Sequence, residues 1–271
     1  MKFPDGVAKM EALETLKEVG VSLQSLEFLS GLGQLKNLRN LALGSYTNDT
    51  VEAAEERNRA IVTSLCELGT QNLQSLTIRD GRGLLQVHMC ELSTLEKLVN
   101  CSLQVPQIPK WVSSLRNLQQ LILQVKGVKQ DDLCMLGSLP ALDILDLTEK
   151  TGSNEKLRIS GIVGFQSLRI FIYSGTGDFP VDLMFAAGSM PNLEKLVLNY
   201  LLLVEANSVG FGIENLPFLT TVKCRVNGDE DGIVEAVQSA MERAASRHPN
   251  HPRLFFQEVE AICYSSLPSF D

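Results

Sequence analysis

The sequence predicts an α/β solenoid, in which short parallel strands stack side by side and bury their apolar residues between them. Three observations predict this class. One apolar motif recurs along most of the 271 residues, its copies follow one another at nearly constant spacing, and many copies end in the alternating apolar pattern of a strand. The composition agrees, because 44% hydrophobic and 21% charged residues are typical of a folded globular chain.

The repeated motif has the form L-x-x-L-x-x-L-x-L. It is complete in LKNLRNLAL at residues 35–43, LRNLQQLIL at 115–123 and LPALDILDL at 139–147, and looser copies begin at Met10, Thr70, Leu92, Phe165, Met190 and Leu216. When the copies are aligned on their second apolar position, that position holds Leu13, Leu38, Leu73, Leu95, Leu118, Leu142, Leu168, Leu193 and Leu219. These leucines are 22 to 26 residues apart, except for one interval of 35 residues.

A unit of this length cannot cover the inward residues of its own strand, so neighbouring units must bury them together. The sequence therefore predicts a leucine-rich-repeat solenoid of about nine irregular repeats over residues 1–227, shaped as a curved horseshoe with a parallel β-sheet on its concave face. The interval of 35 residues contains an extra segment, residues 50–65. Its apolar residues suit one face of a helix, which we expect on the outer side: Val51, Ala54, Ile61, Val62 and Leu65.

Chance matches among leucine-rich amphipathic helices are the alternative interpretation of the motif. Two features oppose it. Several units end in an alternating pair such as Leu121 and Leu123, which is the period of a strand. In addition, Pro140, Pro191 and Pro217 would interrupt a helix within the motif.

A different pattern follows the ninth repeat and predicts a C-terminal capping helix. Residues 228–260 begin with acidic residues and then place Ile233, Val237, Ala240, Met241 and Ala244 at helical spacing. A solenoid needs an element that covers its last apolar layer, and we assign this helix to that role. We expect residues 254–256 to pack back on the helix as a return segment, and residues 261–271 to form a loose tail.

Charge and cysteine usage exclude several classes of function. The chain has 24 basic and 32 acidic residues, so its net charge of -8 disfavours general binding to nucleic acid. It has no apolar signal region and no run of 18 apolar residues, so we expect no membrane span. The six cysteines are scattered without close pairs, which favours reduced thiols and a cytoplasmic protein.

No motif predicts catalysis, a cofactor or a metal ion. His88 lies two residues before Cys90, but no HExxH, GxSxG or second ligand pair accompanies them. The carboxylates of residues 228–232 lack the spacing of a calcium loop, and His248 and His251 lie among prolines, as loop residues do. Trp111 has two interpretations, of which we favour a rigid cover on the outer face over an exposed anchor for a partner.

The alternation of side chains along a strand predicts which residues face a partner. If positions three and five after each aligned leucine point inward, positions two, four and six point to the concave face. The candidate partner-binding residues at those positions are Lys17, Arg79, Lys97, Ile122, Ile144, Asp146, Ile170, Ile172, Lys195, Lys223 and Arg225. Val19, Val99 and Val197 fall on the same face by this rule. A face that combines basic and apolar residues suits a protein partner.

Several segments also resemble a known family. They are FPDGVAKMEALETL, LCELGTQNLQSLTI, IPKWVSSLRNLQQLIL, LGSLPALDILDL and, as the most specific, GIENLPFLTTVKCRVNGDEDGIVEAVQSAMERAASRHPNHP. Together they resemble the leucine-rich-repeat region of plant intracellular nucleotide-binding disease-resistance proteins, especially the coiled-coil class of grasses. The resemblance implies repeats that keep a receptor inactive through its nucleotide-binding module and that help to sense pathogen effectors or guarded host proteins. No GxxxxGK[ST] phosphate loop is present, so nucleotide switching is not carried over.

The sequence thus predicts a protein-interaction module of the plant disease-resistance type, not an enzyme. The resemblance implies three kinds of protein partner, namely a pathogen effector, a guarded host protein or the receptor's own nucleotide-binding module. A stand-alone intracellular leucine-rich-repeat scaffold for signalling proteins is the alternative, and an enzyme with a cleft near Cys90 is a remote one. Whether the chain is part of a longer receptor or a repeat-only protein is left open.

Overall fold

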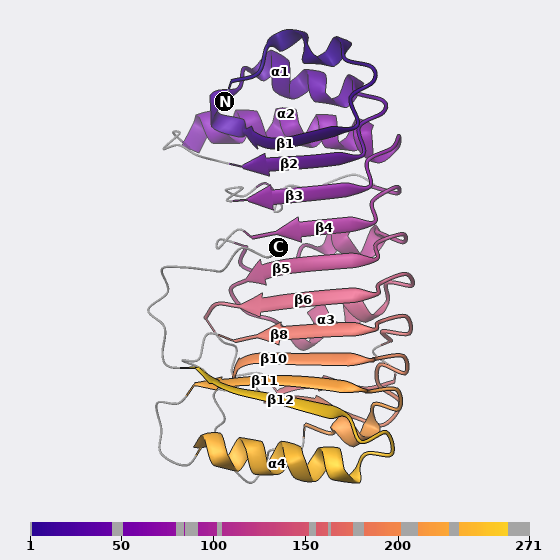
Figure 1. Ribbon diagram of the computed structural model, residues 1–271. Helices are drawn as coiled ribbons and strands as arrows, with labels where there is room; N and C mark the ends of the chain where they lie inside the picture. Colours follow the sequence, from indigo (N-terminus) through magenta and orange to yellow (C-terminus); the bar gives the residue numbers. More distant parts are fainter. Residues whose placement is uncertain are drawn as a thin grey trace.

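The fold is a stack of ten parallel strands backed by helices and irregular turns (Figure 1). The computed structural model describes residues 2–44, 51–79, 84, 92–101, 105–151, 156–161, 164–175, 182–201, 211–227 and 233–259. The strands of the main sheet lie in the order β1 (Thr15–Gly20), β2 (Asn40–Gly44), β3 (Ser75–Arg79), β4 (Lys97–Asn100), β5 (Gln120–Val125), β6 (Ile144–Glu149), β8 (Ile170–Ser174), β10 (Lys195–Leu201), β11 (Thr221–Asn227) and β12 (Arg253–Val259). Figure 1 looks onto this sheet, with α3 behind its middle strands and α1 and α2 at its β1 end.

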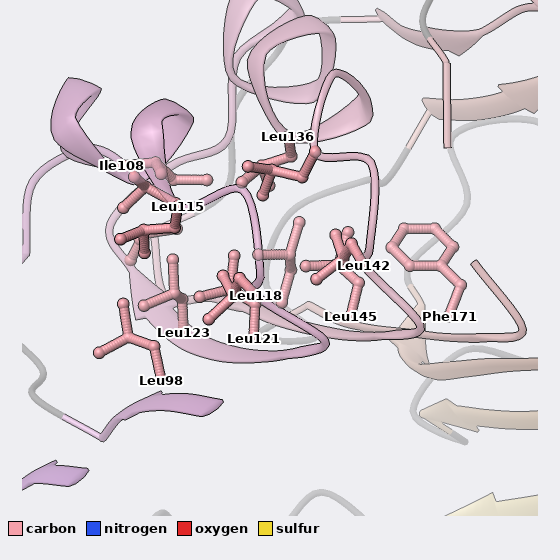
Figure 2. Packing of buried hydrophobic residues seen from close by; sticks show 14 of the residues in the cluster. Leu98, Ile108, Leu115, Leu118, Leu121, Leu123, Leu136, Leu142, Leu145 and Phe171 are labelled. Atoms are coloured by element: carbon pink, nitrogen blue, oxygen red, sulfur yellow. The ribbon is translucent and has the colours of Figure 1, made fainter. Parts of the chain in front are cut away.

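The core lies behind the sheet, where equivalent inward residues of successive strands stack on one another. Leu121 pairs in register with Leu145, and Leu145 pairs with Phe171; none of the three is exposed (Figure 2). Burial of each such leucine stabilises the folded state by about 1.5–3 kcal/mol relative to a leucine that stays exposed. The repeated leucines therefore form one continuous core along the solenoid, and the predicted leucine-rich-repeat class is confirmed.

A recurring polar bond joins the turn before several of the strands to the turn of the preceding repeat. The residue just before the aligned leucine is often asparagine, and its side-chain amide donates to a carbonyl oxygen one repeat earlier. The donors are Asn37, Asn72, Asn117, Asn192 and Asn250, at 2.6 to 2.8 Å from the oxygens of Glu11, Lys36, Ser93, Gln166 and Pro217. Ser167 makes the equivalent bond to the Pro140 oxygen at 2.6 Å. These bonds satisfy turn carbonyls that no strand can pair.

The extra segment in the long interval is helix α2 (Val51–Gly69), which packs behind the sheet beside α1 (Leu26–Gly31). Ile61 and Leu65 are buried, as the helical pattern predicts. Ser64 is buried between them, and its hydroxyl lies 2.7 Å from the Leu29 carbonyl oxygen, so the end of α1 gains a polar partner. The insertion therefore extends the core instead of projecting from it.

A second, two-stranded sheet was not predicted. β7 (Lys156–Ile159) pairs in parallel with β9 (Asp182–Phe185). The side chain of Gln130, the first residue of α3 (Gln130–Gly137), bonds both ways with the backbone of Arg158: its amide donates to the carbonyl oxygen at 2.9 Å and accepts from the N–H at 2.8 Å. The side chain thus pairs backbone groups of β7 that a neighbouring strand would otherwise pair.

The C-terminal segment differs most from the sequence prediction. α4 (Ile233–Arg247) buries Val237, Ala240 and Met241, as its pattern predicts, and lies at the β12 end of the stack (Figure 1). Residues 253–259 do not simply return onto the helix. They form β12, which pairs in register with β11, so the sheet continues beyond residue 227. Leu254 and Phe256 still pack on the core, but from a tenth strand.

His248 belongs to this tenth unit. It lies in the bend between α4 and β12, as expected of a loop residue, but its burial was not expected. Its side chain is fully buried, with Nε2 2.8 Å from the Leu216 carbonyl oxygen. Nδ1 accepts the N–H of Asn250 at 3.1 Å, which requires that Nε2 carry the proton and donate. His248 thus takes the position that Leu216 has one unit earlier, whereas His251 is exposed, as expected of a loop.

Two other expectations have different outcomes. Trp111, in a 3-10 helix (Lys110–Ser114), is only 8% exposed, so it is the structural cover and not the exposed anchor.

Cys66 on α2 is disulfide-bonded, which contradicts the expectation of reduced thiols throughout. Cys101, Cys134 and Cys224 are free. Cys90 and His88 lie outside the described residues, as do residues 228–232 and 261–271.

Candidate protein-interaction surface

The concave face consists of the strand side chains that point away from the core, arranged in three parallel ladders. The strand register aligns them across the sheet. The first ladder runs through Asn40, Ser75, Lys97, Gln120, Ile144, Ile170, Lys195, Thr221 and Arg253; the second through Ala42, Thr77, Val99, Ile122, Asp146, Ile172, Val197, Lys223 and Phe255; the third includes Gln124, Thr148, Ser174, Asn199, Arg225 and Gln257. The ladders bring residues that are far apart in the sequence within one strand spacing, about 4.8 Å.

Ten of the eleven candidate residues lie at their expected strand positions, and Lys17 lies at an irregular point of β1. Arg79, Lys223 and Arg225 are exposed; the half-buried members are Lys97, Lys195, Asp146, Ile122, Ile144, Ile170 and Ile172. Lys17 is exposed, but the register of β1 slips by one residue between Leu16 and Val19. The structure therefore supports the alternation rule in the middle and C-terminal repeats, and locates its failure in the first strand.

The slip in β1 corrects the placement of Val19. Glu18 adopts a left-handed backbone with φ of 57°, which lets an extra residue loop out of the strand. Val19 then turns inward and is not exposed at all, in register with Leu43. Glu18 faces outward instead, with its carboxylate 3.9 Å from the guanidinium of Arg79. Val197 is also nearly buried at 9% exposure, so the apolar part of the face is smaller than expected.

The C-terminal end of the concave face is basic. β10, β11 and β12 contribute Lys195, Lys223 and Arg225, together with Arg253, and the nine ladder positions of these strands include no acidic residue. The Lys223 ammonium nitrogen lies 5.6 Å from the centre of the Phe255 ring, which is 53% exposed. Arg225 donates from Nε to Gln257 Oε1 at 3.2 Å, which orients its guanidinium.

Sequence reasoning missed Arg253 and Phe255, because it placed no strand after residue 227. The sequence does contain a signal for this strand. The Pro-Asn pair that precedes β10, Pro191-Asn192, recurs as Pro249-Asn250, and both asparagines make the same turn bond. Counting from that asparagine gives Arg253 the position of Lys195 and Phe255 the position of Val197. The basic end of the face therefore spans three adjacent strands instead of two.

The centre of the concave face is apolar around one carboxylate. Asp146 lies in register between Ile122 and Ile172, and Ile144 precedes it on the same face of β6. Burial among these side chains raises the pKa of Asp146 to about 6, from an ordinary value of 3.8. Burial thus penalises the carboxylate, which is still the main form at neutral pH, so the charge of Asp146 is costly to the fold there.

We expect Asp146→Asn to stabilise the protein at neutral pH. The folded-state pKa is raised, so folded wild-type protein takes up its proton as the pH falls below about 6, whereas the unfolded chain does so only near 3.8. The variant should therefore be more stable than wild type above pH 6, by about 1–3 kcal/mol. The gap should close as the pH falls to 3.8. Urea denaturation at several pH values measures it, and a gap that is constant with pH would contradict the assignment.

The described residues include no group of three or more His, Cys, Asp or Glu side chains that could hold a metal ion. Within the same ranges, no helix combines the length and apolarity that crossing a bilayer requires. Among the described residues, the concave face combines a basic end with an apolar centre, and it is therefore the candidate interaction surface.

Comparisons with known proteins place the chain in a family. A family model described as a leucine-rich repeat region matches residues 1–254. The disease resistance protein RGA5 of Oryza sativa subsp. japonica is 30% identical over 282 residues, which cover 98% of this chain and 25% of that protein. The disease resistance protein Pik-2 of the same plant is 24% identical, over 85% of this chain and 24% of its own length.

A solved structure, the plant peptide hormone receptor RGFR1 in complex with RGF2, covers 96% of this chain and 41% of its own, with 15% identity and a TM-score of 0.37. The chain spans about a quarter of the length of the two rice proteins. The two rice proteins confirm the expected resemblance to plant disease-resistance proteins. With the ten-stranded parallel stack and the family match over residues 1–254, the chain belongs to the leucine-rich repeat region family.

Proposed function

We propose that this chain is a protein-interaction module of the plant disease-resistance type, which senses an effector or a host protein and regulates an immune receptor in the cytoplasm. The similarity to RGA5 and Pik-2 supports the setting in plant defence. The leucine-rich repeats support binding as the activity, because stacked repeats present an extended surface and no catalytic group is required of it. The partner in this proposal is a protein with an acidic surface.

The basic end of the concave face is the observation that carries the proposal. Lys195, Lys223, Arg225 and Arg253 come from three adjacent strands of a chain whose net charge is -8. Their shared sign is therefore opposite to that of the whole molecule. A local patch of this kind attracts an acidic surface and orients its approach. The exposed ring of Phe255 adds apolar contact area beside these charges.

Charge reversal of Lys97, Lys195, Lys223 and Arg225 to Glu tests the proposal. We expect association with the separately purified nucleotide-binding module of a receptor of this type, measured by surface plasmon resonance, to slow by about tenfold or more. The salt dependence of the association rate should also weaken, because fewer complementary charges remain. The stability of the fold should change little, since these side chains are exposed or half-buried on the face.

A matched control reverses Arg59, Lys110, Arg243 and Arg247, which are exposed and lie on helices instead of strands. Both variants change the net charge by the same amount. If both sets slow association equally, the effect is due to overall charge and not to the concave face. If neither set changes it, the proposed surface does not bind this partner.

A further inference from the structure

In the middle of the concave face, Asp146 is the one charged side chain of the described strands, and its neighbours along and across them are uncharged. Ile122 and Ile172 flank it across the sheet, while Ile144 and Thr148 flank it along β6. Lys97 on β4 and Lys195 on β10 are each two strands away, about 10 Å across the sheet. These lysines are therefore too distant to pair directly with the carboxylate.

The carboxylate has no partner within the part of the chain that the structure describes. Neither a hydrogen bond nor an ion pair joins it to those residues, and burial alone accounts for its raised pKa. The contrast with Asp143, three residues earlier, is direct: Asp143 is bound by the guanidinium of Arg169, with Arg169 Nη2 2.8 Å from Oδ2. Asp146 thus destabilises the fold without forming an internal bond that compensates it.

A carboxylate that costs stability and bonds to none of the described residues is a candidate for a group that binds a ligand. We propose that Asp146 and the isoleucines around it form a binding site for an arginine side chain of a protein partner. This site rests on the proposed function, because it requires that the concave face bind protein. The site is separate from the basic end of the face. A partner that binds both would therefore present an acidic surface to the basic end and an arginine to Asp146.

Arginine fits the chemistry of this site better than other cations. Its guanidinium is planar, weakly hydrated and able to give two parallel hydrogen bonds to one carboxylate. Its aliphatic stem can lie against Ile122, Ile144 and Ile172, which are half-buried and accessible from the concave face. A partner arginine would also relieve the cost of the Asp146 charge, so binding recovers part of the stability that the carboxylate removes.

Methyl NMR of the full chain, with labelled isoleucine side chains, tests the proposal. The probe is acetyl-Leu-Arg-Leu-amide, and the matched probe replaces arginine by citrulline, which has nearly the same shape without the charge. We expect saturable shifts of the Ile122, Ile144 and Ile172 methyl signals with the arginine peptide, at millimolar concentration. Asp146→Asn should raise the dissociation constant by about tenfold or more, because the charged acceptor is lost.

Asp143→Asn is the control variant, since it removes a neighbouring carboxylate that Arg169 already occupies and should leave binding unchanged. Equal shifts with citrulline, equal binding by Asp146→Asn, or no saturable shift at tens of millimolar peptide would each overturn the proposal. The peptide assay does not use the basic end of the face. The peptide can therefore bind even if the four charge reversals leave association unchanged, and it can fail to bind even if they slow association. The two proposals are thus tested separately.

Discussion

Leu145→Ala is expected to lower the free energy of unfolding by about 2–5 kcal/mol. Leu145 is completely buried, and its side chain lies between Leu121 and Phe171 of the neighbouring strands (Figure 2). Truncation removes apolar contacts to both adjacent repeats at once, and the rigid strands on either side cannot close the cavity. Urea denaturation followed by circular dichroism measures the loss.

Phe218→Ala provides the comparison, because Phe218 is also a large apolar residue of a repeat but is 60% exposed. Its truncation should cost less than about 1 kcal/mol. An unchanged denaturation midpoint for Leu145→Ala would contradict the inward position of that residue. Equal losses for the two variants would show that burial in the stack does not determine the cost.

Tyr173→Phe should cost about 2–3 kcal/mol, although it removes a single oxygen atom. Tyr173 is fully buried, and its hydroxyl donates to Oε2 of Glu149, which is only 2% exposed. Burial and the Glu149 charge both raise the pKa of Tyr173, so the hydroxyl keeps its proton and remains a donor. Without it, the described residues offer Glu149 only the N–H of Val128, at 3.3 Å from Oε1. The loss is measurable by urea denaturation.

A double-mutant cycle separates this bond from the packing of the ring. Phe retains nearly all of the ring contacts of Tyr173, so Tyr173→Phe in a Glu149→Leu background should cost clearly less than in wild type. The interaction between the two side chains is the difference between these costs. Additive losses would show that the hydroxyl does not stabilise Glu149.

The repetitive part of the fold could be predicted from the sequence because one physical constraint recurs in every unit. A strand that is covered by its neighbours needs apolar residues at fixed alternation, so Leu121, Leu145 and Leu196 carry the same signal at the same phase. The insertion was predictable for a similar reason, since Ile61 and Leu65 show the helical period over several turns. Nine strands of the main sheet follow from these patterns alone.

The tenth strand was hidden because His248 and His251 stand where the motif expects leucine. His248 can replace leucine only through its two bonds, to the Leu216 oxygen and the Asn250 N–H, which depend on the folded neighbours. The β7–β9 pair was hidden for another reason. Each strand is four residues long and its pairing depends on which segments meet behind the sheet, a tertiary property without a sequence period.

The candidate surface was predictable in its composition but less so in its detail. Alternation alone placed Lys195, Lys223 and Arg225 on one face. It could not reveal the left-handed residue at Glu18 that moves Val19 into the core, because non-glycine residues adopt that conformation only where the surroundings compensate it. Nor could it show that Asp146 has no partner among the residues that the structure describes, since that depends on which side chains the register brings across the sheet.

The polar bond between successive turns determines how this chain tolerates changes of length. Asn117 and Asn192 make the same bond to the preceding turn, so removal or duplication of a whole unit would offer the next turn an identical partner. Copy number is therefore a variable that the architecture leaves free. The number of residues within a strand is not free, because one added residue turns the side chains that follow it in that strand to the opposite face. The first strand absorbs such an addition only through the unusual backbone of Glu18.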